Sequence, residues 1–77
     1  MENICNRVTD IIVVELGVNY DEVIWDACFE DDLECDPLDV IELIGEIEKE
    51  FGITIADEDA AQIETVGDLV MLIYNEM

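Results

Sequence analysis

Carboxylates are the side chains of this sequence that could do chemistry, and many of them are clustered. One cluster spans residues 30–36 and another spans residues 57–59, and such clusters attract calcium or magnesium. Neither has the spacing of an EF-hand loop, which requires alternating acidic positions, a glycine and a distal glutamate. We therefore expect weak, diffuse binding of divalent cations and no specific metal site.

A further set of acidic residues follows the spacing of a helix. Asp39, Glu42 and Glu46 recur at i, i+3 and i+7 on the face opposite an apolar stripe. Like charges four residues apart destabilise a helix, and Lys49 is the only cation nearby to offset them. We interpret this face as a surface that attracts basic partners over a long range.

The residue types that most enzymes use are missing. The 77 residues contain no histidine and no serine, which removes the usual bases and the usual hydroxyl nucleophile. The three cysteines, Cys5, Cys28 and Cys35, form no C-x-x-C pair, and without histidine no ordinary structural zinc site can form. We expect reduced thiols in a protein that is not an enzyme.

The charge balance argues against nucleic acid as a partner, and the apolar pattern argues against a membrane span. Twenty-two acidic against two basic residues give a net charge of −20, whereas a nucleic-acid-binding protein needs cationic side chains to replace counterions. The 52% of apolar residues instead predicts one folded domain over residues 1–77, which we expect to be a monomer. The most apolar stretch, residues 11–18, contains Glu15 and is too short to span a membrane. With Glu2 where a signal peptide carries positive charge, we expect a cytoplasmic protein.

Apolar spacing and end signals predict two long helices in the first part of the chain. One runs from an N-cap at Asn3 to about Leu16 and ends at Gly17. The next starts at Pro37 with Asp36 as its cap, and Gly52 ends it. Between them lies an unusually long connection with one possible helical turn at residues 20–22. Its expected apolar anchors are Val23, Ile24, Trp25, Phe29 and Leu33.

The remaining residues predict a short helix and a final longer one. Residues 57–59 load acid onto the start of a brief third helix that carries Ala60 and Ile63. Thr65 and Asp68 have the spacing of a capping box and open the fourth helix. The inward-facing residues of that helix are expected to be Val66, Leu69, Val70 and Ile73.

Several motifs along the chain resemble those of the acyl carrier protein family. Residues 36–43, Asp-Pro-Leu-Asp-Val-Ile-Glu-Leu, are similar to the family's D-S-L-D-x-x-E-L signature. Residues 29–33 resemble the F-x-x-D-L that precedes it, and residues 48–55, 57–60 and 63–68 resemble later family motifs. The resemblance implies an all-α bundle of three longer helices and one short helix, with a long first connection.

The resemblance also shows that the hydroxyl group to which the family attaches its cofactor is absent from this sequence. In the family, the serine of D-S-L carries 4′-phosphopantetheine, and in this sequence that position is Pro37, which has no hydroxyl. No cofactor is therefore expected on this chain as written. Other departures are Glu34 in place of a usual glycine, Cys35 in place of a small apolar residue, and Ala56 in place of a usual proline. The acidic neighbours of Cys35 (Asp32, Glu34 and Asp36) should discourage its thiolate.

The remaining functional positions of the family transfer onto this chain by resemblance. The residues implied to meet basic patches of partner enzymes are Asp36, Leu38, Asp39, Ile41, Glu42 and Glu48. The residues implied to line an acyl cavity are Leu43, Ile47, Phe51, Ile55, Ala60 and Ile63. Without an arm to deliver an acyl chain, we favour a simple core role for these six.

Three functional hypotheses remain open from the sequence. The leading one is an acyl-carrier-like module of fatty-acid or related acyl metabolism that docks on basic partner enzymes without carrying phosphopantetheine. The second is a variant of a true carrier that has lost its serine. The third is an acidic mimic that blocks nucleic-acid-binding sites.

The net charge generates a first prediction about stability. Sodium, magnesium or calcium salts should raise the melting temperature, because screening relieves repulsion among the carboxylates. Circular dichroism melts from low to physiological salt test this, and a flat melting temperature would contradict it. If divalent ions act far more strongly than sodium at equal ionic strength, a localised site at residues 30–36 or 57–59 is indicated instead.

Overall fold

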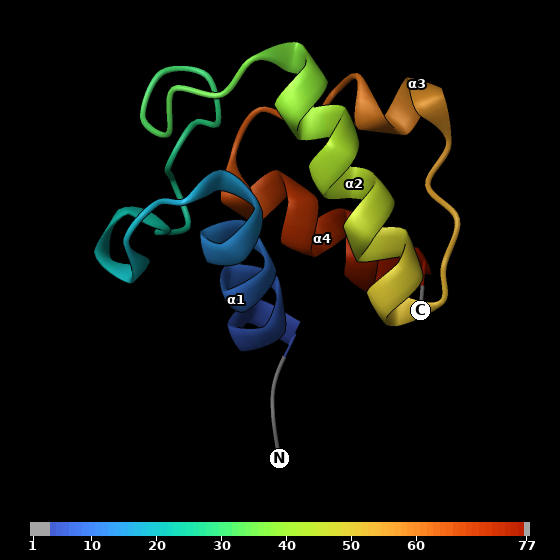
Figure 1. The fold of residues 1–77 in the computed structure, drawn as a ribbon. Coiled ribbons are helices and arrows are strands. Elements are labelled where there is room, and N and C mark those ends of the chain that lie inside the picture. The colour runs from blue at the N-terminus through green and yellow to red at the C-terminus, as the bar shows by residue number, and fades with distance from the viewer. Residues whose placement is uncertain (1–3, 77) are drawn as a thin grey trace.

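The protein folds into a helical bundle in a computed structural model that describes residues 4–76 (Figure 1). The described residues contain no strand, and the prediction of an all-α fold is confirmed. The elements are α1 (Ile4–Leu16), the 3-10 helix η1 (Tyr20–Glu22), α2 (Pro37–Phe51), α3 (Asp57–Ala60) and α4 (Val66–Glu76). The expected N-cap at Asn3 lies outside the described residues.

The C-terminal ends of α1 and α2 lie where the local sequence signals put them. Gly17 and Gly52 follow α1 and α2 with φ values of +67° and +66°, the left-handed conformation that glycine adopts without strain. The Gly52 N–H donates to the Glu48 carbonyl at 2.9 Å and closes the last turn of α2. The predicted short turn at residues 20–22 is η1, and the Asn19 N–H donates to the Glu22 carboxylate there.

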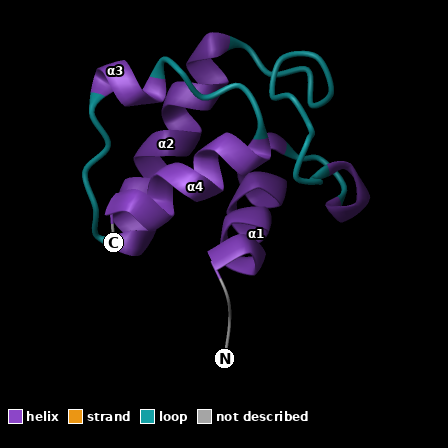
Figure 2. Ribbon diagram, turned by 180° about the vertical axis from the view of Figure 1, so that it is seen from behind, coloured by secondary structure: helices purple, strands orange, loops and turns teal. Residues whose placement is uncertain are grey.

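The core lies between the three long helices. α1 packs against both α2 and α4, and the view from behind shows α1 beside α4 (Figure 2). The largest fully buried side chains are Phe29, Ile12, Leu43, Ile47, Leu69, Ile73, Val8 and Val70. The inward-facing residues expected of the last helix, Val66, Leu69, Val70 and Ile73, are all buried, and Phe29 adds an aromatic ring from the connection. Among residues 4–76, no helix is both long and apolar enough to cross a membrane.

The long connection at residues 17–36 is pinned to the start of α4 by backbone hydrogen bonds. The Val66 N–H donates to the Ala27 carbonyl at 3.0 Å, and the Gly67 N–H donates to the Trp25 carbonyl at 2.9 Å. In return, the Phe29 N–H donates to the Glu64 carbonyl at 2.9 Å. The connection therefore satisfies N–H groups that the first turn of a helix always leaves without an intrahelical partner.

The predicted capping box completes the start of α4. The Asp68 N–H donates to the Thr65 hydroxyl oxygen at 3.1 Å. The Asp68 carboxylate accepts hydrogen bonds from the N–H groups of Thr65 and Glu64, both at 3.1 Å. This prediction is confirmed.

Two of the expected anchors in the connection lie largely at the surface. Ile24 is 59% exposed and Trp25 is 51% exposed, so the prediction that Ile24 is an anchor was wrong. A turn closed by the Ala27 N–H on the Ile24 carbonyl brings Ala27 into the core in its place. Trp25 instead covers Gly67, where an added Cβ would lie 2.6 Å from the indole ring.

The third helix is shorter than the sequence suggested. α3 ends at Ala60, so the expectation that it carries Ile63 was wrong. The Ala61 N–H still bonds four residues back to the Asp57 carbonyl. The N–H groups of Gln62 and Ile63 bond only three residues back, to Asp59 and Ala60, which tightens the chain into a turn. The turn leaves Ile63 on the link to α4, where it still packs against the core.

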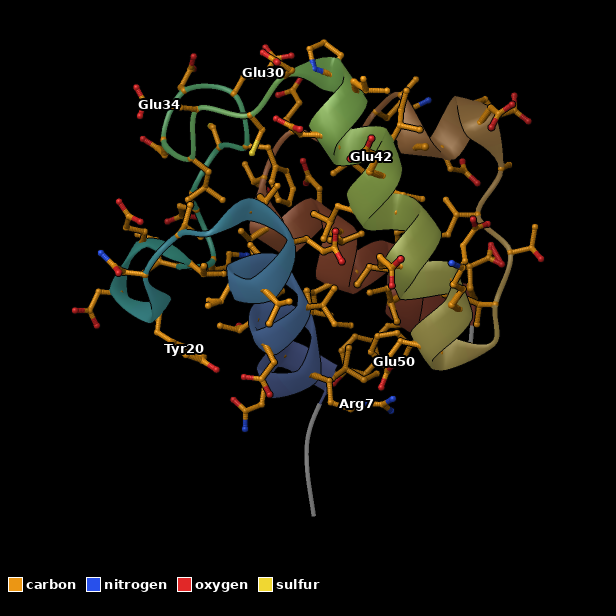
Figure 3. All side chains as sticks on the ribbon, in the orientation of Figure 1. Arg7, Tyr20, Glu30, Glu34, Glu42 and Glu50 are labelled. Carbon is orange, nitrogen blue, oxygen red and sulfur yellow. The ribbon has the colours of Figure 1, made fainter. Side chains whose placement is uncertain are left out.

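One of the two basic residues of the chain joins α1 to the end of α2. The Arg7 guanidinium lies 3.1 Å from the Glu50 carboxylate and 3.3 Å from the Glu50 carbonyl. It also lies over the Phe51 ring, 4.4 Å from the centroid. Arg7 and Glu50 meet at the lower edge of the bundle (Figure 3). The cation thus caps a helix C-terminus and stacks on an aromatic ring.

These contacts predict that the two basic residues differ in their importance for stability. Arg7→Ala should lower the free energy of unfolding by about 1–2 kcal/mol, because it removes an ion pair, a cap and a cation–π contact. Lys49→Ala is the matched control, since it removes the same charge from an exposed pair with Glu46 at 3.7 Å. It should change the stability by about 0.5 kcal/mol or less. Equal losses in urea titrations would contradict this account.

Candidate functional site

The start of α2 is the position at which the sequence motifs converge. Asp36 has the extended backbone of an N-cap, and its N–H donates to the Asp39 carboxylate at 3.2 Å. Pro37 is exposed at the first helical position, where its missing N–H costs nothing and its fixed φ suits a helix. The helix start is therefore well formed without a serine.

The residue two positions before this cap is strained. Glu34 has a φ of +54°, the one positive φ at a non-glycine residue in the described chain. A side chain in this left-handed region costs about 1–2 kcal/mol relative to a right-handed conformation. This geometry explains why glycine suits the position and why Glu34 is a departure that the fold must tolerate.

Cys35 is buried next to the strained residue. Its side chain is 7% exposed, and its thiol lies 3.7 Å from the Leu33 carbonyl as a hydrogen-bond donor. Burial, followed by the charges of Asp39 and Asp36, raises the pKa of the Cys35 thiol. The sequence suggested the direction from acidic neighbours alone, but burial is the larger cause and Asp39 is the leading carboxylate. Cys35 is thus a poor nucleophile at neutral pH.

The outer face of α2 displays apolar side chains among carboxylates. Leu38 is 63% exposed and Ile41 is 64% exposed. Glu42 is also exposed, and Figure 3 shows it on the side of α2 that is turned toward the viewer. Asp36 is also exposed, whereas Asp39 is half-buried. The structure therefore brings five of the six expected partner-binding residues to the first two turns of one helix.

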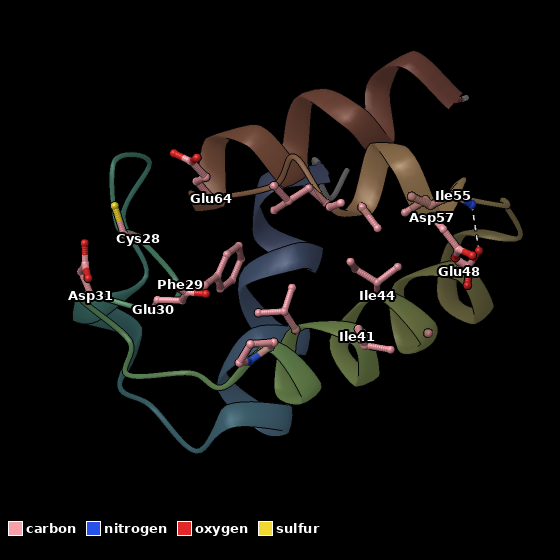
Figure 4. Close-up of a pocket in the computed structure, with 16 residues that line it drawn as sticks. Cys28, Phe29, Glu30, Asp31, Ile41, Ile44, Glu48, Ile55, Asp57 and Glu64 are labelled. Carbon is pink, nitrogen blue, oxygen red and sulfur yellow. Dashed lines mark hydrogen bonds between the residues drawn. The ribbon is translucent and has the colours of Figure 1, made fainter.

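Glu48, the sixth expected partner-binding residue, forms a hydrogen bond within the fold. The Glu48 carboxylate accepts a hydrogen bond from the Ile55 N–H at 2.8 Å and is half-buried (Figure 4). The contact ties the end of α2 to the link that leads into α3. The sequence carries no local signal for this bond, because the partners are seven residues apart across a helix end.

A cavity of about 960 Å³ lies between α2 and the α3 segment, and Pro37 is among its lining residues (Figure 4). Its apolar lining comes from both sides. The apolar residues are Phe29, Val40, Ile41, Ile44, Ile55, Ala60, Ala61 and Ile63. Its acidic residues are Glu30, Asp31, Glu48, Asp57 and Glu64.

Six residues were expected to line an acyl cavity. Three of them, Ile55, Ala60 and Ile63, line the cavity between α2 and the α3 segment. Leu43 and Ile47 are fully buried between the helices. Phe51 lies under the Arg7 guanidinium and packs against the core. All six belong to the core or pack against it, and the α2 wall of the cavity is formed by the neighbouring stripe of Val40, Ile41 and Ile44.

The acidic clusters show no geometry for a dedicated metal ion. Within residues 4–76, no three histidine, cysteine, aspartate or glutamate side chains converge in a way that could hold one. In the first cluster, the Asp32 carboxylate is instead used to accept the Cys28 N–H at 2.8 Å.

A small helical carrier domain is the class that this fold and site define. The family model described as "Phosphopantetheine attachment site" matches residues 6–73. An acyl carrier protein from Enterococcus faecalis is similar, with 38% identity, a TM-score of 0.80, and coverage of 96% of this chain and 94% of that chain. An acyl carrier protein from Thermotoga maritima is also similar, with 28% identity, a TM-score of 0.80, and coverage of 92% and 82%.

The chain belongs to the acyl carrier protein family, and the expected family and fold are confirmed. Acyl carrier proteins are carriers and not enzymes, as the sequence also predicted for this chain. The matched span includes position 37, where this chain has proline.

The raised thiol pKa generates a prediction about reactivity. Iodoacetamide at pH 8 should alkylate Cys35 far more slowly in the folded protein than in urea, because burial and carboxylates keep the thiol protonated. Cys28 should be slowed as well, since partial burial and then Asp32 and Asp31 raise its pKa. Raising the pH should speed both reactions in the folded protein. Peptide mass spectrometry measures each site, and equal rates for Cys35 in both states would contradict the assignment.

Proposed function

We propose that this chain is a docking module with the acyl carrier fold that carries no phosphopantetheine. It presents the outer face of α2 to basic patches on enzymes of fatty-acid or related acyl metabolism. It works as a single-domain monomer over residues 1–77, in the cytoplasm. The observation that carries the proposal is Pro37, exposed at the first position of α2 beside the cavity.

The residues present do not fit a covalently attached cofactor. Attachment requires a hydroxyl oxygen at the start of α2 to attack the phosphate, and a proline ring offers none. No serine occurs elsewhere among the 77 residues. The Thr9 hydroxyl donates to the Cys5 carbonyl inside α1, and the Thr65 hydroxyl caps α4. Thr54 follows the other end of α2, so none of the three threonines is placed at the helix start.

The exposed face of α2 supports docking. Leu38 and Ile41 are both more than 60% exposed and lie three residues apart, so they form an apolar pair on the helix surface. Apolar side chains surrounded by charge have the arrangement of an interface core with a polar rim. The net charge of −20 would speed encounters with a positively charged partner.

Two alternatives fit parts of the same observations. A carrier that has lost its serine would have the same face and would regain its chemistry on restoring the hydroxyl. An acidic mimic of nucleic acid is favoured by the net charge alone and gives no role to Leu38 and Ile41. Displacement of the chain from acyl-chain enzymes, and not from DNA-binding proteins, would separate docking from mimicry.

The proposal predicts that one substitution restores the attachment site. Pro37→Ser, incubated with a phosphopantetheinyl transferase and coenzyme A, should gain the mass of one phosphopantetheinyl group in intact-protein mass spectrometry. The native chain and a Pro37→Ala control should gain none. The substitution should cost about 0.4–1 kcal/mol of stability, because serine restricts the unfolded chain less than proline does.

A second variant in this experiment also removes the backbone strain at Glu34. Glu34→Gly combined with Pro37→Ser also relieves the left-handed strain before the helix. Modification of the native chain would overturn the proposal. Failure of both folded serine variants would show that the recognition surface itself has diverged from the family.

A further inference from the structure

A row of exposed apolar side chains runs along the outer side of α4. Met71 is 51% exposed and Tyr74 is 53% exposed, and they follow Gly67 at the i+4 and i+7 positions of the helix. Long side chains on a helix lean toward its N-terminus, so Tyr74 leans toward Met71, and Met71 leans toward Gly67. The exposed indole of Trp25 covers Gly67 from the connection. Trp25, Met71 and Tyr74 therefore form one continuous surface, which we call the α4 stripe.

The spacing of the α4 stripe matches one side of a second helix. Positions i, i+4 and i+7 lie along one side of a helix, which is the spacing at which helices pack against each other. From Gly67 to Tyr74 the stripe extends over about 10 Å of helix axis, and Trp25 widens it at the first turn. A helix of about three turns, lying along α4, would cover it.

The charges beside the α4 stripe are negative. Asp26 follows Trp25, and Glu64 and Asp68 flank Gly67 in the chain, and all three are exposed. α4 itself contains no lysine or arginine, so no side chain of the helix offsets the negative end of its dipole. A second copy of this chain would bring a further net charge of −20 to this surface, which disfavours self-association. The surface is complementary to an occupant with cations beside an apolar side.

We propose that the α4 stripe docks an amphipathic helix of a partner protein that carries arginines beside its apolar side. The apolar side packs along Met71 and Tyr74, and guanidinium groups lie on the exposed aromatic rings and near the carboxylates. Arginine suits this surface better than lysine, because its planar guanidinium stacks on aromatic rings and pairs with carboxylates through two hydrogen bonds.

The α4 stripe is separate from the outer face of α2. α4 lies behind α2 in Figure 1 and in front of it in the view from behind in Figure 2. Each of the two helices turns its exposed side away from the core that they share. The two surfaces are therefore accessible at the same time, and docking on α4 does not rest on the function proposed for α2.

The fluorescence of Trp25 tests the proposal directly, because it is the only tryptophan among the 77 residues and lies in the α4 stripe. The probe is a tryptophan-free helical peptide of about 18 residues, with leucines along one side and arginines on the rest. Titrating it into the native chain at physiological salt should shift the emission to shorter wavelengths, because the bound helix removes the indole from water.

Three control peptides define what the stripe recognises. A scrambled peptide of the same composition has no apolar side and should bind about 10-fold more weakly or worse. A peptide with glutamates in place of arginines should not bind, and one with lysines should bind about 2-fold more weakly or worse. Equal affinities for the ordered and scrambled peptides would show attraction to the net charge alone and would overturn the proposal. An equal affinity for the lysine peptide would overturn the assignment of arginine.

A matched pair of variants tests whether the peptide binds on α4. Met71→Lys/Tyr74→Lys reverses the chemistry of the stripe, and Val14→Lys/Thr54→Lys adds the same charge at exposed positions away from it. With folding checked by circular dichroism, the first should weaken the arginine peptide by about 10-fold or more, and the second by about 2-fold or less. Equal affinities of the two folded variants, or bound peptide that leaves the Trp25 emission unchanged, would overturn the proposal. A native dimer in light scattering that Met71→Lys/Tyr74→Lys abolishes would also overturn it, in favour of a second copy as the occupant.

Discussion

The first turn of α4 needs hydrogen-bond acceptors from outside the helix, and the long first connection supplies them. The carbonyls of Ala27 and Trp25 accept from the N–H groups of Val66 and Gly67. These two bonds fix the connection against the opposite end of the chain, so that Phe29 enters the core and residues 30–36 lead directly to α2. The closeness of the indole ring to Gly67 adds a steric condition, since any side chain at Gly67 would collide with it. These hydrogen bonds also fix the position of the candidate site. The segment that they hold contributes Phe29 to the cavity lining and leads into the first residue of α2, Pro37.

Chemistry and scaffold are separable at the start of α2. The family's function depends on one hydroxyl, whereas the helix start depends on the extended backbone of Asp36 and its bond to Asp39. Pro37 is compatible with this helix start, but it provides no hydroxyl. Pro37 is one of the residues that line the cavity, and the outer face of α2 is formed by later residues of the helix, Leu38, Ile41 and Glu42. Under the proposed function, the chain lacks the attachment chemistry at Pro37 and uses the outer face of α2 for recognition.

The sequence predicted those features that depend on neighbours along the chain. Gly17, Gly52, Pro37 and the pair Thr65 and Asp68 mark helix ends, and each acts through bonds within a few residues. Features that depend on tertiary contacts were missed: Trp25 over Gly67, Arg7 on Phe51, and Glu48 on the Ile55 N–H. The wall of the cavity shows the same limit. Periodicity identified the apolar residues of α2, but it could not tell which of two adjacent stripes faces α1 and α4 and which faces the cavity.

The central claim is that the outer face of α2 recognises the same enzymes as a working acyl carrier protein. A competition assay measures this directly, with the native chain displacing a phosphopantetheinylated acyl carrier protein from a fatty-acid-metabolising enzyme with a basic docking patch. Ile41→Lys/Glu42→Lys reverses the chemistry of the face, and Val14→Lys/Glu15→Lys makes matched changes at exposed positions on α1. The account predicts displacement by the native chain and by the α1 variant, and none by the α2 variant. Failure of the folded native chain to compete, or equal competition by both variants, would contradict it.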